Sequence, residues 1–254
     1  MISEGKVKRN AFHAEGIYEM VIETGVCGNF IPGQFINIYL DDKSLLLPRP
    51  ISICDGKSDS VTIVYRTVGK GTSHLATYPV NKRIKISGPL GNGYDIKDDY
   101  SGMSVALIGG GVGIPPLVGL AKVLKERNAS VHVFLGFASE VFLTGKFGPL
   151  SKNVNIATDD GNAGFHGNAA ELLKADGRVY DDYFACGPKA MLKSMCEYAE
   201  VVGRDIQVSV EERMGCGYGA CVGCTCKVIE NGEIVRKKVC SHGPVFWGKE
   251  LVWD

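Results

Sequence analysis

The sequence predicts a multidomain β plus α/β protein, with an antiparallel β-barrel, a parallel-sheet α/β unit and a small cysteine-rich unit at the C-terminus. Three observations predict this order. Short β-branched and aromatic segments alternate with turn residues through the first hundred positions. A strand, a glycine-rich turn and a helix follow from Ser104, and five of the nine cysteines lie between Cys216 and Cys240. We expect domains at residues 1–100, 101–205 and 206–254.

The composition is that of an ordinary globular protein and disfavours several functional classes. Of 254 residues, 45% are hydrophobic and 22% charged, and Lys plus Arg and Asp plus Glu both total 28. A net charge of zero provides no attraction to nucleic acid or to an anionic membrane. No apolar run approaches the ~18 residues of a membrane span, and residues 1–10 lack the apolar core of a signal peptide. We therefore expect a cytoplasmic protein that binds neither nucleic acid nor membrane.

The first unit contains several short segments that are typical of strands. Turn dipeptides separate them, including Pro32-Gly33, Asp55-Gly56 and Gly88-Pro89. Strands at this spacing favour a small antiparallel barrel. The clearest predicted strands are residues 17–22, 35–40, 51–54, 61–65 and 83–86.

The second unit begins with a continuous apolar run at residues 105–108, and then a glycine-rich turn and a helix. Pro115 and Pro116 are tolerated only in the first turn of such a helix. A later helix is predicted to end at Gly203 in a left-handed cap. Further strands are predicted at residues 131–135, 154–157 and 183–185. This alternation predicts a mostly parallel sheet.

The glycine-rich turn is a candidate nucleotide site. Its glycines are Gly109, Gly110, Gly111 and Gly113. Backbone N–H groups and the dipole of the following helix would face a pyrophosphate there. The pattern departs from G-x-G-x-x-G because Pro116 occupies the third glycine position, and a purely structural strand–helix turn remains the alternative.

Two further segments of the α/β unit are candidates for nucleotide contacts. Glu140 follows the second strand and could accept a ribose 2′-OH. No Arg or Lys lies between this strand and Lys146 to bind a 2′-phosphate. This favours NAD over NADP, although a solvated acid is the alternative. Cys186, Gly187 and Pro188 follow the fourth strand at the edge where ligands bind in open α/β sheets. A buried thiol before a turn is the alternative there.

The barrel segment contains residues that suit a flavin nucleotide. Arg49, Pro50, Ile51 and Ser52 combine a phosphate-binding cation, a rigid turn and a hydroxyl group. Tyr65 and Arg66 add an aromatic face and a second cation, and Gly71 and Thr72 belong to a glycine-rich anion-binding loop. Taken singly, each has a structural alternative: surface charge for the arginines, barrel core for Tyr65 and a hairpin turn for residues 69–72.

The C-terminal cysteines have the spacing of an iron–sulfur site. Cys216, Cys221 and Cys224 form C-x4-C-x2-C, and Cys240 follows after a predicted hairpin whose turn is Asn231-Gly232. This is the plant-type arrangement of four thiolates around a 2Fe-2S cluster. The glycines at 215, 217, 219 and 223 let the loop approach the sulfurs and direct N–H groups at them.

Three alternatives to this ligand set exist. A zinc ribbon normally has two C-x2-C pairs, and only Cys221 with Cys224 fits. A Rieske centre needs two histidines, whereas His242 is the only histidine after position 166. Cys226 is a fifth thiol in the same region and remains the rival ligand.

These motifs together resemble the ferredoxin-reductase family of flavoproteins, in the same order along both of its domains. They are Pro32 to Phe35, Arg49 to Ser52, Gly69 to Thr72, Gly88 to Gly91, Gly109 to Pro116 and Cys186 to Pro188. The segments 213–224 and 238–246 are similar to those of class B dihydroorotate dehydrogenase electron-transfer subunits. The resemblance covers essentially the whole chain.

The resemblance implies a set of cofactors and a partner. It implies FAD on Arg49 to Ser52, Val64 to Arg66 and Gly71 to Thr72, NAD(H) on the α/β unit, and 2Fe-2S on the four cysteines. It also implies an FMN-containing catalytic subunit that oxidises dihydroorotate to orotate in pyrimidine biosynthesis, with two copies of each chain. No catalytic triad or carboxylate pair is evident, so we place that chemistry on the partner.

Two other functions stay open from the sequence. The first is a related flavin and 2Fe-2S reductase subunit that serves ferredoxin or a sulfur-reducing partner. The second, from another class, is a zinc-stabilised binding module without redox activity.

Overall fold

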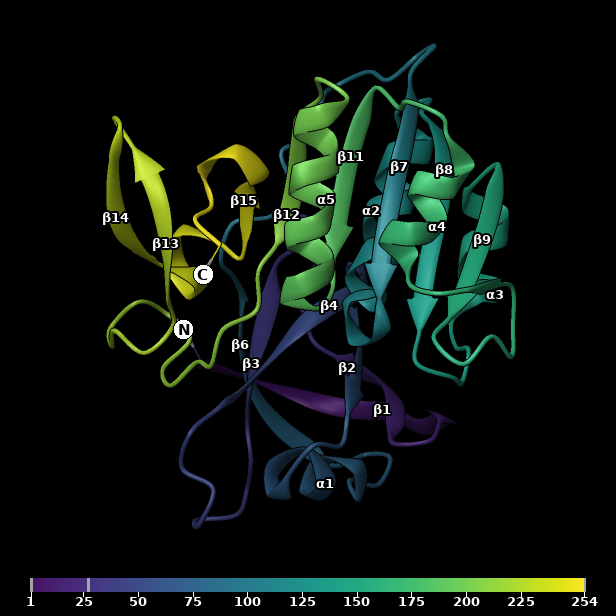
Figure 1. Cartoon of the computed structure of the whole chain (residues 1–254). Helices are drawn as coiled ribbons and strands as arrows, with labels where there is room; N and C mark the ends of the chain where they lie inside the picture. Colours follow the sequence, from purple (N-terminus) through teal and green to yellow (C-terminus); the bar gives the residue numbers. More distant parts are fainter. Residues whose placement is uncertain (1, 27, 254) are drawn as a thin grey trace.

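The structure is a computed structural model that describes residues 2–26 and 28–253. A closed barrel lies below a seven-stranded sheet, and a two-stranded hairpin stands beside one edge of that sheet (Figure 1). The expected barrel, α/β unit and small C-terminal unit are thus all present. Within the described residues, no helix has the length and apolar character needed to cross a membrane.

The barrel is antiparallel throughout, with the strand order β1-β2-β5-β4-β3-β6. Its elements are β1 (Ile2–Ala14), β2 (Ile17–Glu23), β3 (Phe35–Tyr39), β4 (Arg49–Lys57), β5 (Ser60–Arg66), α1 (Lys70–Ala76) and β6 (Arg83–Leu90). Strand β3 has two apolar faces: Ile36 and Ile38 lie in the barrel core, whereas Phe35 packs with the core of the C-terminal part. Because side chains alternate along a strand, β3 joins two cores.

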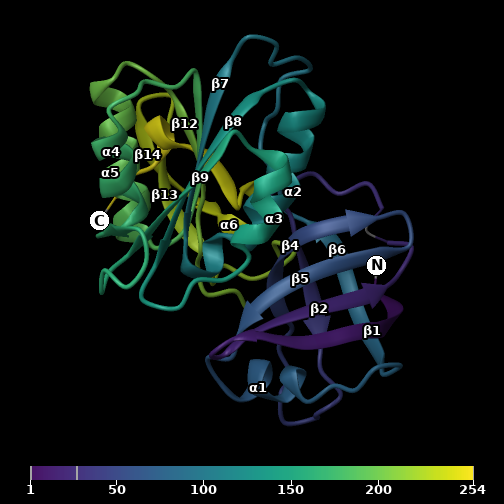
Figure 2. The ribbon, with the colours of Figure 1, turned by 90° about the vertical axis from the view of Figure 1, so that its right-hand side faces the viewer.

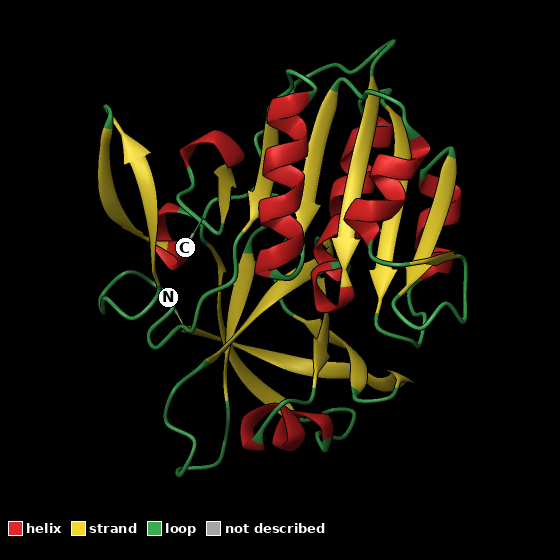
Figure 3. Ribbon diagram, viewed as in Figure 1, coloured by secondary structure: helices red, strands yellow, loops and turns green. Residues whose placement is uncertain are grey.

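The α/β unit is a seven-stranded sheet in the order β10-β9-β8-β7-β11-β12-β15, parallel except for β15. Helices α4 and α5 cover one face, and α2 and α3 cover the other (Figures 1 and 2). Its elements are β7 (Ser104–Gly110), η1 (Gly111–Gly113), α2 (Pro115–Glu126), β8 (Ser130–Phe137), α3 (Thr144–Phe147), η2 (Gly148–Leu150), β9 (Asn153–Thr158), β10 (Phe165–His166), α4 (Ala169–Asp176), β11 (Asp182–Cys186) and α5 (Lys189–Val201). Figure 3 shows the resulting helix–sheet–helix layers.

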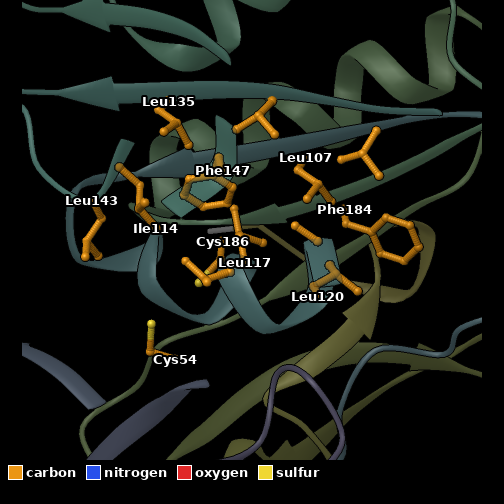
Figure 4. Packing of buried hydrophobic residues seen from close by; sticks show 14 of the residues in the cluster. Cys54, Leu107, Ile114, Leu117, Leu120, Leu135, Leu143, Phe147, Phe184 and Cys186 are labelled. Atoms are coloured by element: carbon orange, nitrogen blue, oxygen red, sulfur yellow. The ribbon is translucent and has the colours of Figure 1, made fainter. Parts of the chain in front are cut away.

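Helix α2 joins the sheet to the barrel. Both prolines predicted for its first turn occupy that turn, and its apolar residues are buried beneath the sheet (Figure 4). Gly119 permits close approach of the barrel, because a Cβ there would lie 3.1 Å from the carbonyl oxygen of Cys54. Residues of the barrel, including Cys54 and Val64, therefore share one core with Leu107 of the sheet.

The C-terminal part is interleaved with the α/β sheet. It comprises β12 (Ile206–Ser209), β13 (Thr225–Glu230), β14 (Glu233–Lys238), α6 (Val239–His242), β15 (Val245–Trp247) and η3 (Gly248–Glu250). Strands β12 and β15 belong to the sheet, although both fall in the range 206–254. The predicted domain boundary at residue 205 separates β12 and β15 from the other strands of their sheet, and it stays a prediction.

The local conformations expected from glycine and asparagine are present at two places. Asn231 and Gly232 connect β13 and β14 with φ values of 53° and 82°, as the predicted Asn-Gly hairpin requires. Gly203 follows α5 with φ of 67°, the left-handed conformation of a helix cap.

A buried carboxylate links the barrel to the α/β unit. Glu19 of β2 is 3% exposed and forms ion pairs with Arg9 at 3.2 Å and with Lys146 of α3 at 2.7 Å. Burial opposes ionisation, but hydrogen bonding to Lys146 and the neighbouring cations outweigh burial and lower the pKa of this carboxyl. Glu19 is therefore an ionised clamp between the two units.

We predict that Glu19→Gln lowers the free energy of unfolding at pH 7 by about 1–3 kcal/mol, because the charged hydrogen bonds and ion pairs of a buried carboxylate are lost. The lowered pKa means that the clamp stabilises the fold above pH 4.5, the ordinary value, and that this contribution disappears as pH falls below it. Urea unfolding across pH 3.5 to pH 7 should therefore show a flatter profile for the variant.

Glu23→Gln is the matched control, because its ion pair with Lys8 is about half exposed on both sides. Exposed pairs of this kind contribute little to stability. Equal decreases in the free energy of unfolding of the two variants would contradict the role of Glu19 as a clamp.

Candidate functional site

The four predicted ligand cysteines lie around one glycine-rich loop and the start of α6. Cys224 and Cys240 are buried, and Cys216 and Cys221 are partly exposed. Backbone N–H groups point at the sulfurs: Gly219 donates to Sγ of Cys240 at 3.2 Å, and Cys221 donates to Sγ of Cys216 at 3.3 Å. This is the arrangement that the loop glycines were expected to allow.

The four thiols are coupled to one another. The thiol of Cys216 interacts with Cys221, and that of Cys240 interacts with both Cys224 and Cys216. Within residues 2–26 and 28–253, no three His, Cys, Asp or Glu side chains are gathered as a site for a single ion. Four cysteine thiolates are the ligand set of a 2Fe-2S cluster.

The thiols of Cys216 and Cys240 differ in pKa. Burial opposes ionisation of Cys216, but N–H groups of Cys221 and Tyr218 donate to its sulfur and lower its pKa to about 6. Burial and the adjacent Cys224 raise the pKa of Cys240 to about 11. The loop therefore favours a thiolate at Cys216, which is the form that binds iron.

Cys226 has a different environment from the four. It lies in β13, opposite Lys237, and lines a cavity of 410 Å³ between the start of α5 and the hairpin. Burial raises the pKa of its thiol, as it does for Cys240, so protonation does not separate Cys226 from the four. Its position on the wall of this cavity does.

The barrel brings the separate flavin candidates together. The side chain of Arg49 packs directly on Gly71, where a Cβ would collide with the guanidinium group. Arg49 to Ser52 start β4, and residues 69–72 are neither an open loop nor a hairpin turn but the beginning of α1. The hydroxyl group of Thr72 accepts a hydrogen bond from the N–H of Val68 at 2.9 Å, which fixes this segment. The cation and helix start form one surface suited to phosphate.

The predicted flavin contacts on β5 are not equivalent. Val64 is buried, and the ring of Tyr65 is 2% exposed, stacks on Tyr18 and donates from Oη to Asn10 at 3.0 Å. The ring therefore lies in the barrel core, as the structural alternative expects, and a flavin contact by Tyr65 stays a prediction. Arg66 is exposed.

The glycine-rich turn and the Cys186-Gly187-Pro188 segment form one surface. A Cβ on Gly113 would collide with the backbone of Cys186, and one on Gly110 would lie 2.8 Å from Cδ of Pro188. These two glycines are therefore required for packing. Gly111, by contrast, has φ of 52° and open space around it, and its backbone is available to a ligand. Burial raises the pKa of Cys186 to about 12, which makes its thiol unreactive.

A cavity of 150 Å³ brings Gly111, Glu140 and Arg66 together between the barrel and the sheet. Oε2 of Glu140 accepts a hydrogen bond from the N–H of Glu15 at 2.8 Å. The remaining lone pairs of the carboxylate can still accept from a hydroxyl group. Lys146 is held by Glu19, whereas Arg66 lines the same cavity, so the preference for a 2′-hydroxyl over a 2′-phosphate stays a prediction.

The sequence provided no signal for one buried contact at this site. Asn37 of β3 donates from Nδ2 to the carbonyl oxygen of Cys216 at 2.9 Å, across 179 positions of the chain. A single asparagine within an apolar strand was the only available sign.

Comparisons with known proteins agree with this geometry. Residues 211–252 match the family described as the iron-sulfur cluster binding domain of dihydroorotate dehydrogenase B. The chain is 41% identical over 245 residues to the dihydroorotate dehydrogenase B (NAD(+)) electron transfer subunit of Geobacillus thermodenitrificans, with 94% of each chain covered. It is 37% identical to the subunit of the same name from Fusobacterium nucleatum, with 98% of each covered.

The chain belongs to the family of dihydroorotate dehydrogenase B electron transfer subunits. The sequence prediction of an electron-transfer oxidoreductase subunit is therefore confirmed, and the predicted FAD, 2Fe-2S and NAD(H) are supported by the same matches. The match of the cysteine segment to an iron–sulfur domain removes the support for a zinc module.

Solved structures extend this relationship. A chain of an NADH-dependent reduced ferredoxin–NADP oxidoreductase superposes with a TM-score of 0.86 at 31% identity, covering 98% of this chain and 90% of that one. A ferredoxin NADP+ reductase from Neisseria gonorrhoeae superposes with a TM-score of 0.64 at 16% identity, covering 80% of this chain and 92% of that one, which shows the fold alone. The predicted flavin-reductase architecture is confirmed.

Gly113→Ala should destabilise the α/β unit and abolish NADH oxidation, because the new methyl group collides with the backbone of Cys186. Gly111→Ala meets no neighbour and should cost only about 1–2 kcal/mol for its left-handed conformation. Thermal unfolding and the KM for NADH, measured on both variants, check this. A milder effect at Gly113 than at Gly111 would contradict the packing role.

Proposed function

We propose that this chain carries electrons between NAD(H) and the FMN of a catalytic subunit that oxidises dihydroorotate to orotate. The observation that carries the proposal is the set of four cysteines around a loop that is hydrogen-bonded to β3, the barrel strand next to β4. That position is suited to exchange with a flavin on β4. The names of the relatives supply the reaction, and the absence of a catalytic triad or carboxylate pair among the sequence motifs places the dihydroorotate chemistry on the partner.

The cofactor roles of individual residues are part of this proposal. Cys216, Cys221, Cys224 and Cys240 would hold the 2Fe-2S cluster through their four thiolates. Arg49 to Ser52 and Gly71 to Thr72 hold FAD, with contributions from the backbone of residues 64–65. When bound, FAD exchanges two electrons with nicotinamide and single electrons with the cluster.

We propose one change to the role of Arg66, which the sequence motifs give as an FAD contact. Arg66 lines the cavity that also contains Gly111 and Glu140, so we place its guanidinium group on the pyrophosphate of NAD(H). Glu140 accepts from the ribose, Gly110 and Gly113 pack the turn, and Gly109, Cys186, Gly187 and Pro188 form the neighbouring floor of the site.

The partner surface is proposed around the cluster loop. Tyr218 is 61% exposed and Val222 is 73% exposed, although both lie next to the cysteines. Large exposed apolar side chains beside a redox centre suit a protein interface. An FMN-containing subunit and two copies of each chain remain the proposed assembly, and a cytoplasmic location remains a prediction.

A ferredoxin-linked subunit is the second candidate, because the ferredoxin–NADP oxidoreductase chain superposes along nearly the whole length. The higher identity to dihydroorotate dehydrogenase B subunits favours the first proposal. The partner decides between them.

The test combines this chain, reconstituted with FAD, iron and sulfide, with an FMN-containing dihydroorotate dehydrogenase catalytic subunit. We expect the complex to reduce NAD with dihydroorotate, and the chain alone to oxidise NADH only with artificial acceptors. Reduction of ferredoxin by the chain, with no orotate from a cofactor-replete complex, would refute the proposal.

Cys221→Ser should lose the visible and EPR signals of the cluster and keep stoichiometric FAD, because one iron loses a thiolate while the barrel is untouched. Iron, sulfide and flavin contents measured on the same sample check this. Cys226→Ser is the matched control, since its thiol lines the cavity and its loss should leave the cluster intact. The opposite pattern would replace Cys221 by Cys226 in the ligand set.

A further inference from the structure

The outward face of β3 is the surface on which the cluster loop rests. The Cα atom of Asn37 pairs with that of Pro50 in β4 on one side and with that of Ser87 in β6 on the other. Its neighbours Ile36 and Ile38 point into the barrel, so the amide of Asn37 points out of it. There it is fully buried and donates to the carbonyl oxygen of Cys216.

The contact is built from both sides. Gly217 adopts φ of 73°, and a Cβ there would lie 2.5 Å from Oδ1 and 2.6 Å from Nδ2 of Asn37. The loop backbone therefore lies directly on the amide, and only glycine allows both the conformation and the approach.

The energetics of this side chain require an explanation. Oδ1 of Asn37 is buried and has no hydrogen-bond partner among the described residues. A buried unsatisfied acceptor costs about 1–3 kcal/mol, and an apolar side chain of similar volume would avoid that cost. What an apolar side chain cannot provide is the hydrogen bond to Cys216.

We propose that Asn37 is a positioning residue that holds the cluster loop at Cys216 in fixed register with the flavin-binding strand β4. The proposal rests on the proposed ligand role of Cys216. Partners of this kind, one step beyond the ligands, orient the ligating atoms and tune the metal. Here the same residue also belongs to the wall that separates the flavin strand from the loop, and electron transfer slows steeply as such a separation grows.

The experiment uses Asn37→Ala and Asn37→Leu in the full chain reconstituted with FAD, iron and sulfide. The leucine variant keeps a side chain of similar volume but cannot donate to the carbonyl oxygen of Cys216. We expect full FAD content, flavin reduction by NADH at the unaltered rate, and a changed EPR spectrum of the dithionite-reduced cluster. Cluster reduction by NADH in stopped-flow measurements should slow by about tenfold.

Gln207→Ala is the matched control. Gln207 is also a buried amide, 4% exposed, and its side chain exchanges two hydrogen bonds with the backbone of Asp95, away from the cluster loop. We expect this variant to lose stability without a change in the EPR spectrum. A merely structural role for Asn37 would make the two variants alike, which would overturn the proposal.

Further outcomes of these measurements also test the positioning role of Asn37. An unchanged EPR spectrum and unchanged cluster reduction in both Asn37 variants overturn the proposal, and so does loss of FAD or of folding in both. Gly217→Ala provides an independent measure, because its methyl group should disturb the cluster spectrum more when Asn37 is present than in the Asn37→Ala background. A wild-type cluster in Cys216→Ser would instead refute the ligand assignment, which separates that failure from a failure of the positioning role.

Discussion

The pairing of β3 with β4 is the constraint on which the rest of the structure depends. One side of β3 fills the barrel, and the other side meets the cysteine loop, while β4 supplies the flavin segment and contacts α2 through Cys54. Barrel, sheet and cluster loop therefore meet at two adjacent strands. Because protein interiors are close-packed, a shift of either strand would be transmitted to all three.

Contacts with the barrel also fix one segment of the α/β unit at the boundary between the two. The segment after β8 is fixed at both ends by the barrel: Glu140 receives the N–H of Glu15, and Lys146 pairs with Glu19. A nucleotide bound there would thus contact a loop whose position the flavin domain already determines. Preorganisation of this kind reduces the entropy lost on binding.

The fold was predictable where a local pattern determines it. Spacing alone identified the four cysteines, the Asn231-Gly232 hairpin and the prolines of α2, because each depends on backbone conformation or ligand geometry within a short stretch. The resemblance of many motifs supplied the flavin and nucleotide residues. Tyr65 shows the limit: an aromatic residue in a strand has the same sequence pattern whether it faces a cofactor or the core.

What the sequence did not predict depends on distant partners. Strands β12 and β15 were assigned to the cysteine-rich unit because nothing local shows that Val208 and Phe246 would lie side by side on a sheet edge formed by another segment. Helix α4 was missed although Asn168 and Glu171 form a complete capping box. Asn37 and Arg66 acquired their roles only through contacts across the chain.

Because β12 and β15 are neighbours in the sheet, the cluster unit is an insertion between two strands and not a separate domain that follows the sheet. Residues 210–244 leave the sheet at the end of β12 and return to it at β15. Removal of everything after residue 205 would strip two strands and leave β11 as an open edge with unpaired backbone groups, which invites aggregation. A docked protein that exerts force on the cluster loop would therefore act, through β12 and β15, directly on the sheet that carries Cys186.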